Sequence, residues 1–213
     1  LGLSAFIAEL SSSIALIVFN IVIFNIKGNT GVAAYGIIAN IALVVIAMFN
    51  GVAQGIQPIA SRNSGEGDYQ SIKKVCGLSV VFCVALSSVI YAASVIYANE
   101  IIRIFNSEGN MILAKLAHRG IIIYFVGFFF AGINISCSAL LSSINCPKPA
   151  FAISITRACV ASVPLVISLS MILDMEGVWL SFVFTEFIAA VLSFISIRKY
   201  LFSNQKSRNL SLD

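Results

Sequence analysis

The sequence contains few charged residues for its length. Only 10% of its 213 residues are Asp, Glu, Lys or Arg, whereas a soluble domain carries about 25%. A soluble fold needs polar side chains to cover its surface, and this chain does not have enough of them. We therefore expect lipid, rather than water, to surround most of the chain. The net charge of +4 does not indicate nucleic-acid binding, because no acidic or basic tail accompanies it.

Residue types that build metal and catalytic sites are also scarce. His118 is the single histidine, and the five cysteines form no CxxC pair and no Cys/His cluster. Such cysteines behave as small hydrophobic residues. We expect no disulfide framework, no metal site and no cofactor, and the absence of a nucleophile–base set predicts that the protein is not an enzyme. The chain opens at Leu1 in an apolar run without a signal peptide, and we interpret it as a fragment with a further segment upstream.

Long apolar runs dominate the rest of the sequence. Hydrophobic residues make up 59% of the chain, and the mean hydropathy is +1.00. A helix needs about 20 apolar residues to span a bilayer, and these continuous runs do not alternate as barrel strands do. The sequence predicts an all-α integral membrane protein with one six-helix unit over residues 1–200 and a cytoplasmic polar tail over 201–213. The predicted spans are Leu3–Ile26, Val32–Ile59, Val75–Tyr97, Gly120–Ile144, Ala150–Leu173 and Val178–Ile197.

The distribution of Lys and Arg predicts the orientation in the membrane. If both termini are cytoplasmic, nine of the thirteen Lys and Arg residues lie on the inner side, as the positive-inside rule favours. We therefore expect both ends of this segment on the cytoplasmic side of the cell inner membrane. Trp179 then lies near the outer interface, where indole rings are common. The connection Ala98–Arg119 predicts a short amphipathic helix in the interface.

Three ionisable residues fall inside the predicted spans: Glu9, Arg157 and Glu186. An ionisable group at the centre of a span costs about 2.5–3.5 kcal/mol, so it usually faces protein or water. The functional interpretation is a proton- or cation-linked site, and the alternative is an interhelical hydrogen bond or a buried pair. Glu9 and Arg157 both lie about 10 Å into the membrane from the cytoplasmic side. We expect them to pair if their spans are neighbours, the alternative being that Arg157 extends to the headgroups.

Uncharged polar residues are numerous inside the same spans. They can join helices by hydrogen bonds or line an aqueous cavity, and spacing alone does not separate the two. The candidate residues for a cation-coupling site or a substrate cavity are Glu9, Asn20, Asn40, Gln54, Asn134 and Glu186.

The stretch GVAQGIQPIASRNSGEGDYQSIKK (residues 51–74) has glycines but neither the phosphate-binding P-loop pattern nor the EF-hand pattern. Its start is a small-xxx-small pair that allows close helix packing. We expect a helix to end at its Gln-Pro dipeptide, a turn to follow, and a new helix to begin at Ser71. The residues with a predicted structural role are Gly51, Gly55, Gln57, Pro58, Asn63 and Gly65, together with Arg157.

This combination of G-x-x-x-G-x-Q-P-I, a polar link, N-x-G-x-G-D and a basic helix start resembles the multidrug and toxic compound extrusion (MATE) family. Gly31–Ile59 resembles the eighth helix of that family. Ser4–Asn20 resembles the seventh, with Glu9 at the position of an acidic residue that the family often carries. Members have twelve helices in two six-helix lobes, so six spans correspond to one lobe. The glutamate in the first span implies that this is the C-terminal lobe. An N-terminal lobe is then expected upstream or as a separate chain.

The resemblance implies a multi-pass antiporter that exports amphipathic, often cationic xenobiotics by alternating access, driven by Na⁺ or H⁺. The sodium-coupled branch has a further acidic residue in its tenth helix, where the span 120–144 has only Asn134 and serines. The aspartate of the proton-linked branch lies in the N-terminal lobe. The coupling ion and the substrate are therefore left open, and Glu186 matches no family site.

Two other functions are compatible with the sequence. One is a lipid-linked oligosaccharide flippase of the same superfamily. That resemblance implies a cavity lined by several cationic residues for pyrophosphate, whereas Arg157 is the single cationic residue inside a predicted span, which argues against a flippase. The other is a non-transporting membrane scaffold subunit, in which Glu9 and Glu186 have structural roles alone.

Overall fold

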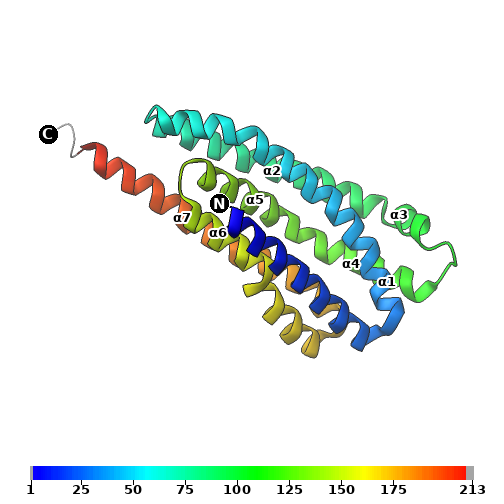
Figure 1. Ribbon diagram of the computed structural model, residues 1–213. Helices are drawn as coiled ribbons and strands as arrows, with labels where there is room; N and C mark the ends of the chain where they lie inside the picture. Colours follow the sequence, from blue (N-terminus) through cyan, green and yellow to red (C-terminus); the bar gives the residue numbers. More distant parts are fainter. Residues whose placement is uncertain (1, 210–213) are drawn as a thin grey trace.

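The computed structural model describes the backbone of residues 2–209 and the side chains of residue 7 and residues 10–200. Every regular element in this part of the chain is helical (Figure 1). A 3₁₀ turn, Phe125–Gly127, joins α4 to α5, and a π-helical turn, Thr156–Val160, joins α6 to α7. The helices are α1 (Gly2–Gly65), α2 (Tyr69–Ile96), α3 (Ala98–Phe105), α4 (Met111–Tyr124), α5 (Phe128–Ser143), α6 (Pro147–Ile155) and α7 (Ser162–Asn209).

Four helical segments of the described chain are long and apolar enough to cross a membrane: Leu10–Gly65, Tyr69–Ile96, Met111–Ser143 and Pro147–Tyr200. The prediction of an all-helical chain is thereby confirmed. Large apolar side chains on the outside of the bundle, such as Leu78, Val81 and Phe82 on α2, are more than half exposed. Such a surface suits contact with lipid tails.

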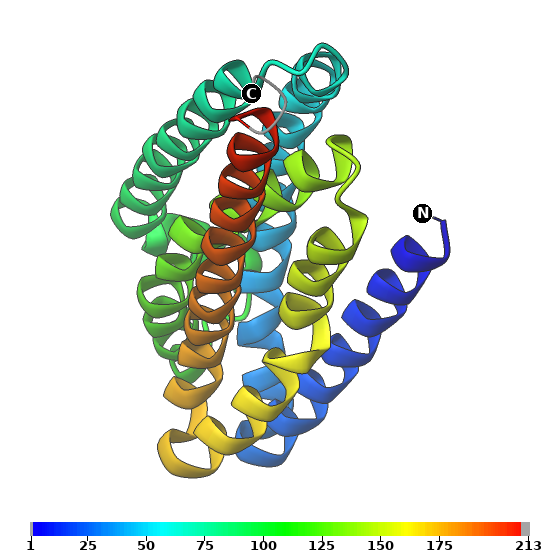
Figure 2. The same cartoon turned by 90° about the vertical axis from the view of Figure 1, so that its left-hand side faces the viewer.

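Two of the long segments are interrupted by residues with non-helical backbone angles. Gly28 (φ 59°, ψ −151°) interrupts α1, and Asp174 (φ 50°, ψ −132°) interrupts α7. Positive φ is readily adopted by glycine and is strained for aspartate. The chain reverses direction at both points (Figures 1 and 2). They lie in the short sequences KGNTG and DMEG, between stretches of apolar helix.

The segment Met111–Ser143 packs at the centre of the bundle, and three of its glycines allow close approach of other helices. A methyl group added at Gly120 would collide with Ile38 and Trp179. Equivalent methyl groups at Gly127 and Gly132 would collide with the rings of Phe182 and Phe49. Because these three glycines lack a side chain, α1 and α7 can pack closely against the central segment.

The close packing expected at Gly51 and Gly55 has no counterpart among the described residues, and it stays a prediction. A methyl group added at either glycine would meet nothing within 4 Å. The side chain of Trp179 is fully buried in the bundle and stacks on Tyr35 with ring centroids 6.2 Å apart. Its expected depth near the outer interface stays a prediction.

The expected helix end at Gln57-Pro58 is also wrong, because α1 continues through Pro58 to Gly65. A proline inside a helix removes one backbone hydrogen bond. Membrane helices tolerate this where other groups or a local change of helix geometry satisfy the freed carbonyl. The following helix begins at Tyr69, two residues before Ser71. Its N-cap is Asp68, whose carboxylate accepts a hydrogen bond from the Ser71 backbone N–H at 3.1 Å. The hydrogen bonds from Ser71 hold the pKa of Asp68 below its usual value.

The predicted amphipathic connection Ala98–Arg119 is divided between two helices. Its first part is α3, which buries Ala98 and Ile102 and exposes Ile104. Its second part, from Met111, belongs to α4 and continues into the central segment. The Asn110 side chain caps α4 by accepting hydrogen bonds from two backbone N–H groups, which explains why the helix starts so early.

Candidate functional site

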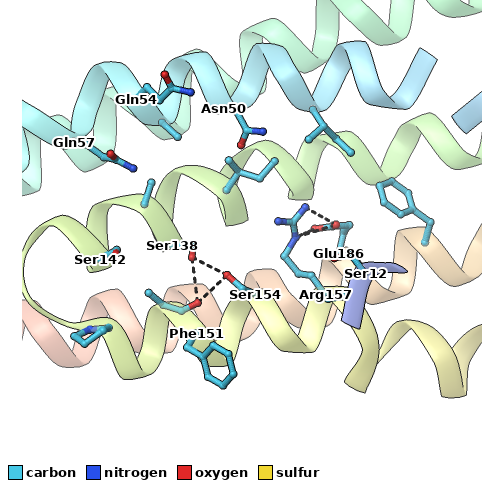
Figure 3. Close-up of a pocket in the computed structure, with 18 residues that line it drawn as sticks. Ser12, Asn50, Gln54, Gln57, Ser138, Ser142, Phe151, Ser154, Arg157 and Glu186 are labelled. Carbon is cyan, nitrogen blue, oxygen red and sulfur yellow. Dashed lines mark hydrogen bonds and ion pairs between the residues drawn. The ribbon is translucent and has the colours of Figure 1, made fainter. Parts of the chain in front are cut away.

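A cleft of about 660 Å³ opens between α1 on one side and α5, α6 and α7 on the other (Figure 3). Ligand-binding pockets in proteins have volumes of about 300–1,000 Å³. The cleft is lined by apolar residues and by an unusual number of polar ones for so apolar a chain. Its polar lining residues are Ser12, Asn50, Gln54, Gln57, Ser138, Ser142, Ser154, Arg157 and Glu186.

The α1 side of the cleft carries three amides: Asn50, Gln54 and Gln57. They are spaced four and three residues apart, which places them on one face of the helix. All three residues are exposed, and Figure 3 shows them along the same helix above the cleft. This wall offers amide oxygens and N–H groups to a ligand.

On the opposite side of the cleft, serine hydroxyl groups link α5 to α6. The Oγ atoms of Ser138 and Ser154 lie 3.2 Å apart, and each lies 3.1 Å from the carbonyl oxygen of Ala150. These contacts fix α6 against α5 below the cleft (Figure 3). Phe151 and Phe182 add aromatic surface to the lining.

Arg157 and Glu186 form an ion pair at one end of the cleft. The Arg157 Nε atom donates to Oε2 of Glu186 at 2.8 Å and to Oε1 at 3.0 Å, and Nη2 donates to Oε1 at 2.8 Å. Such two-pronged arginine–carboxylate pairs are among the stronger ion pairs in proteins. The pair connects the π-helical turn to α7.

Asn134 of α5 lies behind this ion pair and is fully buried. Its Nδ2 group donates to the Glu186 carboxylate at 2.8 Å and to the Glu186 backbone carbonyl at 2.9 Å. Its Oδ1 atom accepts a hydrogen bond at 2.9 Å from the hydroxyl of Ser193, which lies on α7 after Glu186. The buried carboxylate is therefore held from two sides, as a charge in an apolar interior requires.

The π-helical turn determines where Arg157 points. Its wider spacing is visible in the hydrogen bond from the Ala161 N–H to the Thr156 carbonyl at 3.0 Å, five residues back. Such turns change the direction in which side chains leave a helix and are frequent at functional sites. Here the turn lies beside the cleft, and Arg157 projects from it toward Glu186 (Figure 3).

The structure brings some of the predicted site residues together and separates others. Gln54, Gln57, Arg157 and Glu186 line the cleft, and Asn134 contacts Glu186 directly. The amides of Asn20 and Asn40 instead donate to the carbonyls of Leu16 and Gly36 one turn back on α1. Residues of the predicted turn motif that do not line the cleft are Gly51, Gly55, Pro58, Asn63 and Gly65.

The side chain of Glu9 lies outside the described residues, so the expected pair of Glu9 with Arg157 is not part of this description. The partner that the structure shows for Arg157 is Glu186. Among the described residues, Arg157 and Glu186 thus form a partly buried ion pair, and the expected contact with Glu9 stays a prediction.

Several residues of the site were not among the sequence-predicted ones: Asn50, Ser138, Ser142, Phe151, Ser154 and Ser193. A helical-periodicity test could have found some of them. Asn134, Ser138 and Ser142 recur every fourth residue, which places them along one side of α5. No comparable signal marks Ser193. Within the described residues, no group of three or more His, Cys, Asp or Glu side chains could hold a metal ion.

Comparisons with known proteins agree with this architecture. The MatE family model matches residues 5–167, while no curated protein matches the sequence. An outward-facing multidrug resistance MATE family transporter of the MOP superfamily superposes with a TM-score of 0.90 at 19% sequence identity, covering 96% of this chain and 46% of that one. The inward-facing conformation of such a transporter gives a TM-score of 0.91 at 20% identity, with 96% and 47% covered.

A third solved structure is a MOP superfamily transporter from Pyrococcus furiosus, described as having a binding pocket of reverse polarity. It superposes with a TM-score of 0.88 at 19% identity, and the match covers 96% of this chain and 46% of that one. The present chain thus spans about half the length of the solved transporters that it matches, and it shares their helical fold. Because the family model covers more than half of its residues, the chain belongs to the MatE family.

Proposed function

We propose that the chain is the C-terminal half of a cation-coupled multidrug efflux antiporter, which exports amphipathic, often cationic compounds across the cytoplasmic membrane by alternating access. The observation that carries this proposal is the polar cleft of about 660 Å³ in an otherwise apolar helical unit. Amide groups on α1 and the aromatic rings of Phe151 on α6 and Phe182 on α7 suit a ligand with both polar and apolar parts.

In this proposal the breaks at Gly28 and Asp174 divide the four long segments into six spans. Six spans make one lobe, and a second lobe of the same kind would close the cleft on its open side. An even number of spans also places the beginning of α1 and the end of α7 on one side of the membrane. Figure 2 supports this, because both lie toward the same end of the bundle.

Coupling to an inward flow of Na⁺ or H⁺ is part of the proposal. The candidate carboxyl groups are Glu9, which the family resemblance favours, and Glu186, which lies at the cleft. A flippase for lipid-linked pyrophosphates is less well supported, because the single Lys or Arg among the described lining residues is Arg157 and its charge is neutralised by Glu186.

A binding measurement tests the cleft directly. The full chain in lipid nanodiscs should bind the amphipathic cation rhodamine 123 in a saturable manner, measured by fluorescence polarisation. The variant Asn50→Ala/Gln54→Ala should bind it more weakly. Ser88→Ala is the control, since Ser88 lies exposed on α2 and donates to its own helix at Val84. Absence of saturable binding would contradict the proposed substrate cleft.

A transport measurement tests the half-transporter assignment. Alternating access in a repeat-built transporter needs two lobes around a central site. The chain in proteoliposomes should therefore give no export of rhodamine 123 under a proton or sodium gradient. Gradient-driven export by monomers of this chain would contradict the assignment as one lobe.

A further inference from the structure

The Arg157–Glu186 pair presents unequal faces to the cleft. The side chain of Arg157 is 20% exposed, whereas that of Glu186 is 3% exposed. Both residues line the cleft, but the guanidinium lies on the accessible side and the carboxylate is behind it (Figure 3). A ligand entering the cleft therefore meets the arginine before it meets the glutamate.

The hydrogen bonds of the carboxylate are already taken. Glu186 accepts from Nε and Nη2 of Arg157 and from Nδ2 of Asn134, all at 2.8–3.0 Å. A cationic group of a ligand would have to displace Arg157 to reach it. A buried carboxylate without a partner is strongly unfavourable. The cationic group of the ligand would therefore have to replace nearly all the contacts that Arg157 makes with Glu186.

The guanidinium, in contrast, has donors to spare. An arginine side chain carries five N–H donors in a planar fork. Glu186 takes the Nε donor and one of the two on Nη2. Within the described part of the chain no residue accepts a hydrogen bond from Nη1, so three N–H donors remain for a ligand.

We propose that Arg157 is a substrate-binding residue that receives a carboxylate of the transported compound, so that this lobe takes zwitterionic amphiphiles in preference to simple cations. The inference rests on the proposed function, since it names the substrate class of the same cleft. Glu186 and Asn134 are positioning residues, which hold the guanidinium with its free edge toward the cleft. The cationic end of the ligand then lies toward the amide oxygens of Gln54 and Asn50.

The net charge of the site favours a ligand with both charges. The ion pair is neutral as a whole, so a simple anion is attracted by the guanidinium of Arg157 and repelled by the carboxylate of Glu186 behind it. A zwitterion places its negative end on Arg157 and its positive end near the α1 amides. Hydrogen bonds between an arginine and a carboxylate are charge-assisted and stronger than neutral ones, particularly where water is limited.

Two dyes that differ in one group allow a direct test. Rhodamine 110 carries a free carboxylate, and rhodamine 123 is its methyl ester. We expect the full chain in nanodiscs to bind rhodamine 110 about tenfold more tightly than the ester, a difference of about 1.4 kcal/mol, because the ester cannot form the charge-assisted hydrogen bond with Arg157. Fluorescence polarisation gives both dissociation constants under the same conditions.

Two variants separate binding from folding. The double variant Arg157→Gln/Glu186→Gln removes both charges and retains hydrogen-bonding groups of similar size. It should bind the two dyes with equal affinity. Arg157→Lys keeps the positive charge and its pairing with Glu186 but has no free fork, and it should lose most of the preference. Ser88→Ala should keep the tenfold ratio.

The outcomes are distinct. A ratio near one in the wild-type chain, with both dyes bound, would overturn the role of Arg157 and leave the proposed function in place. An equal loss of affinity for both dyes in the double variant would also overturn it, because a purely structural role of the pair has that effect. Failure of both dyes to bind the wild-type chain would contradict this inference and the proposed function together.

Discussion

The guanidinium of Arg157 is joined to the carboxylate of Glu186 through Nε and Nη2, with the shorter contact to each carboxylate oxygen at 2.8 Å. The two residues are 29 positions apart, and their contact ties the π-helical turn to α7. Asn134 of α5 holds the same carboxylate from behind. This one relationship therefore connects three helical elements beside the cleft.

Removing one partner of this pair should destabilise the protein more than removing both. Glu186→Gln should lower the free energy of unfolding by about 3 kcal/mol, because the guanidinium loses its partner in a poorly hydrated place. Arg157→Gln should have a similar effect. The double variant should cost less than either single variant, because it leaves no unpaired charge. Denaturant unfolding followed by the fluorescence of Trp179, the single tryptophan, gives the three values. Additive effects would show that the two residues are not energetically coupled.

Asn134→Ala should destabilise the protein and loosen Glu186. The change leaves the carboxylate and the Ser193 hydroxyl each without one hydrogen bond, and each unsatisfied buried group costs about 1–3 kcal/mol. Ser193→Ala is the matched comparison, since it removes only one hydrogen bond of the same residue. We expect Ser193→Ala to have the smaller effect on the unfolding midpoint. Equal midpoints for Asn134→Ala and wild type would contradict this network.

Gly120 and Gly55 should respond in opposite ways to alanine. A methyl group at Gly120 would collide with Ile38 and Trp179, whereas one at Gly55 would meet none of the described residues within 4 Å. Overpacking of this kind destabilises by about 1–3 kcal/mol. Alanine in place of an open helical glycine stabilises by about 0.5–1 kcal/mol. Thermal unfolding of both variants, with the emission wavelength of Trp179 as a local report, checks the prediction. A neutral Gly120→Ala would show that the helices can separate there without loss.

Gly28 and Asp174 should also show effects of opposite sign. Both have positive φ at the chain reversals. Gly28→Ala introduces a side chain where the backbone disfavours one, and Asp174→Gly relieves such strain. Strain of this kind costs about 1–3 kcal/mol. We expect a lower unfolding temperature for Gly28→Ala and a higher one for Asp174→Gly. The same sign for both would mean that contacts of the Asp174 side chain outweigh its backbone strain.

The sequence alone was sufficient for the class of protein and for part of the site. Scarce charges and long apolar runs predicted a helical membrane protein, because a backbone in lipid must satisfy its own hydrogen bonds. Polar and ionisable residues inside those runs, such as Gln54 and Glu186, were predicted to face protein or a cavity, since such groups are unfavourable against lipid. The residues 51–74 carried the family resemblance.

The tertiary structure decided which of these residues meet. The structure shows that Arg157 pairs with Glu186, and local periodicity does not contain that information because it depends on which helices are neighbours. The same reason explains why Gly120, rather than Gly51 or Gly55, lies at a close contact. Side-chain spacing determines which face of a helix is polar, but only the packing of distant segments determines what that face contacts.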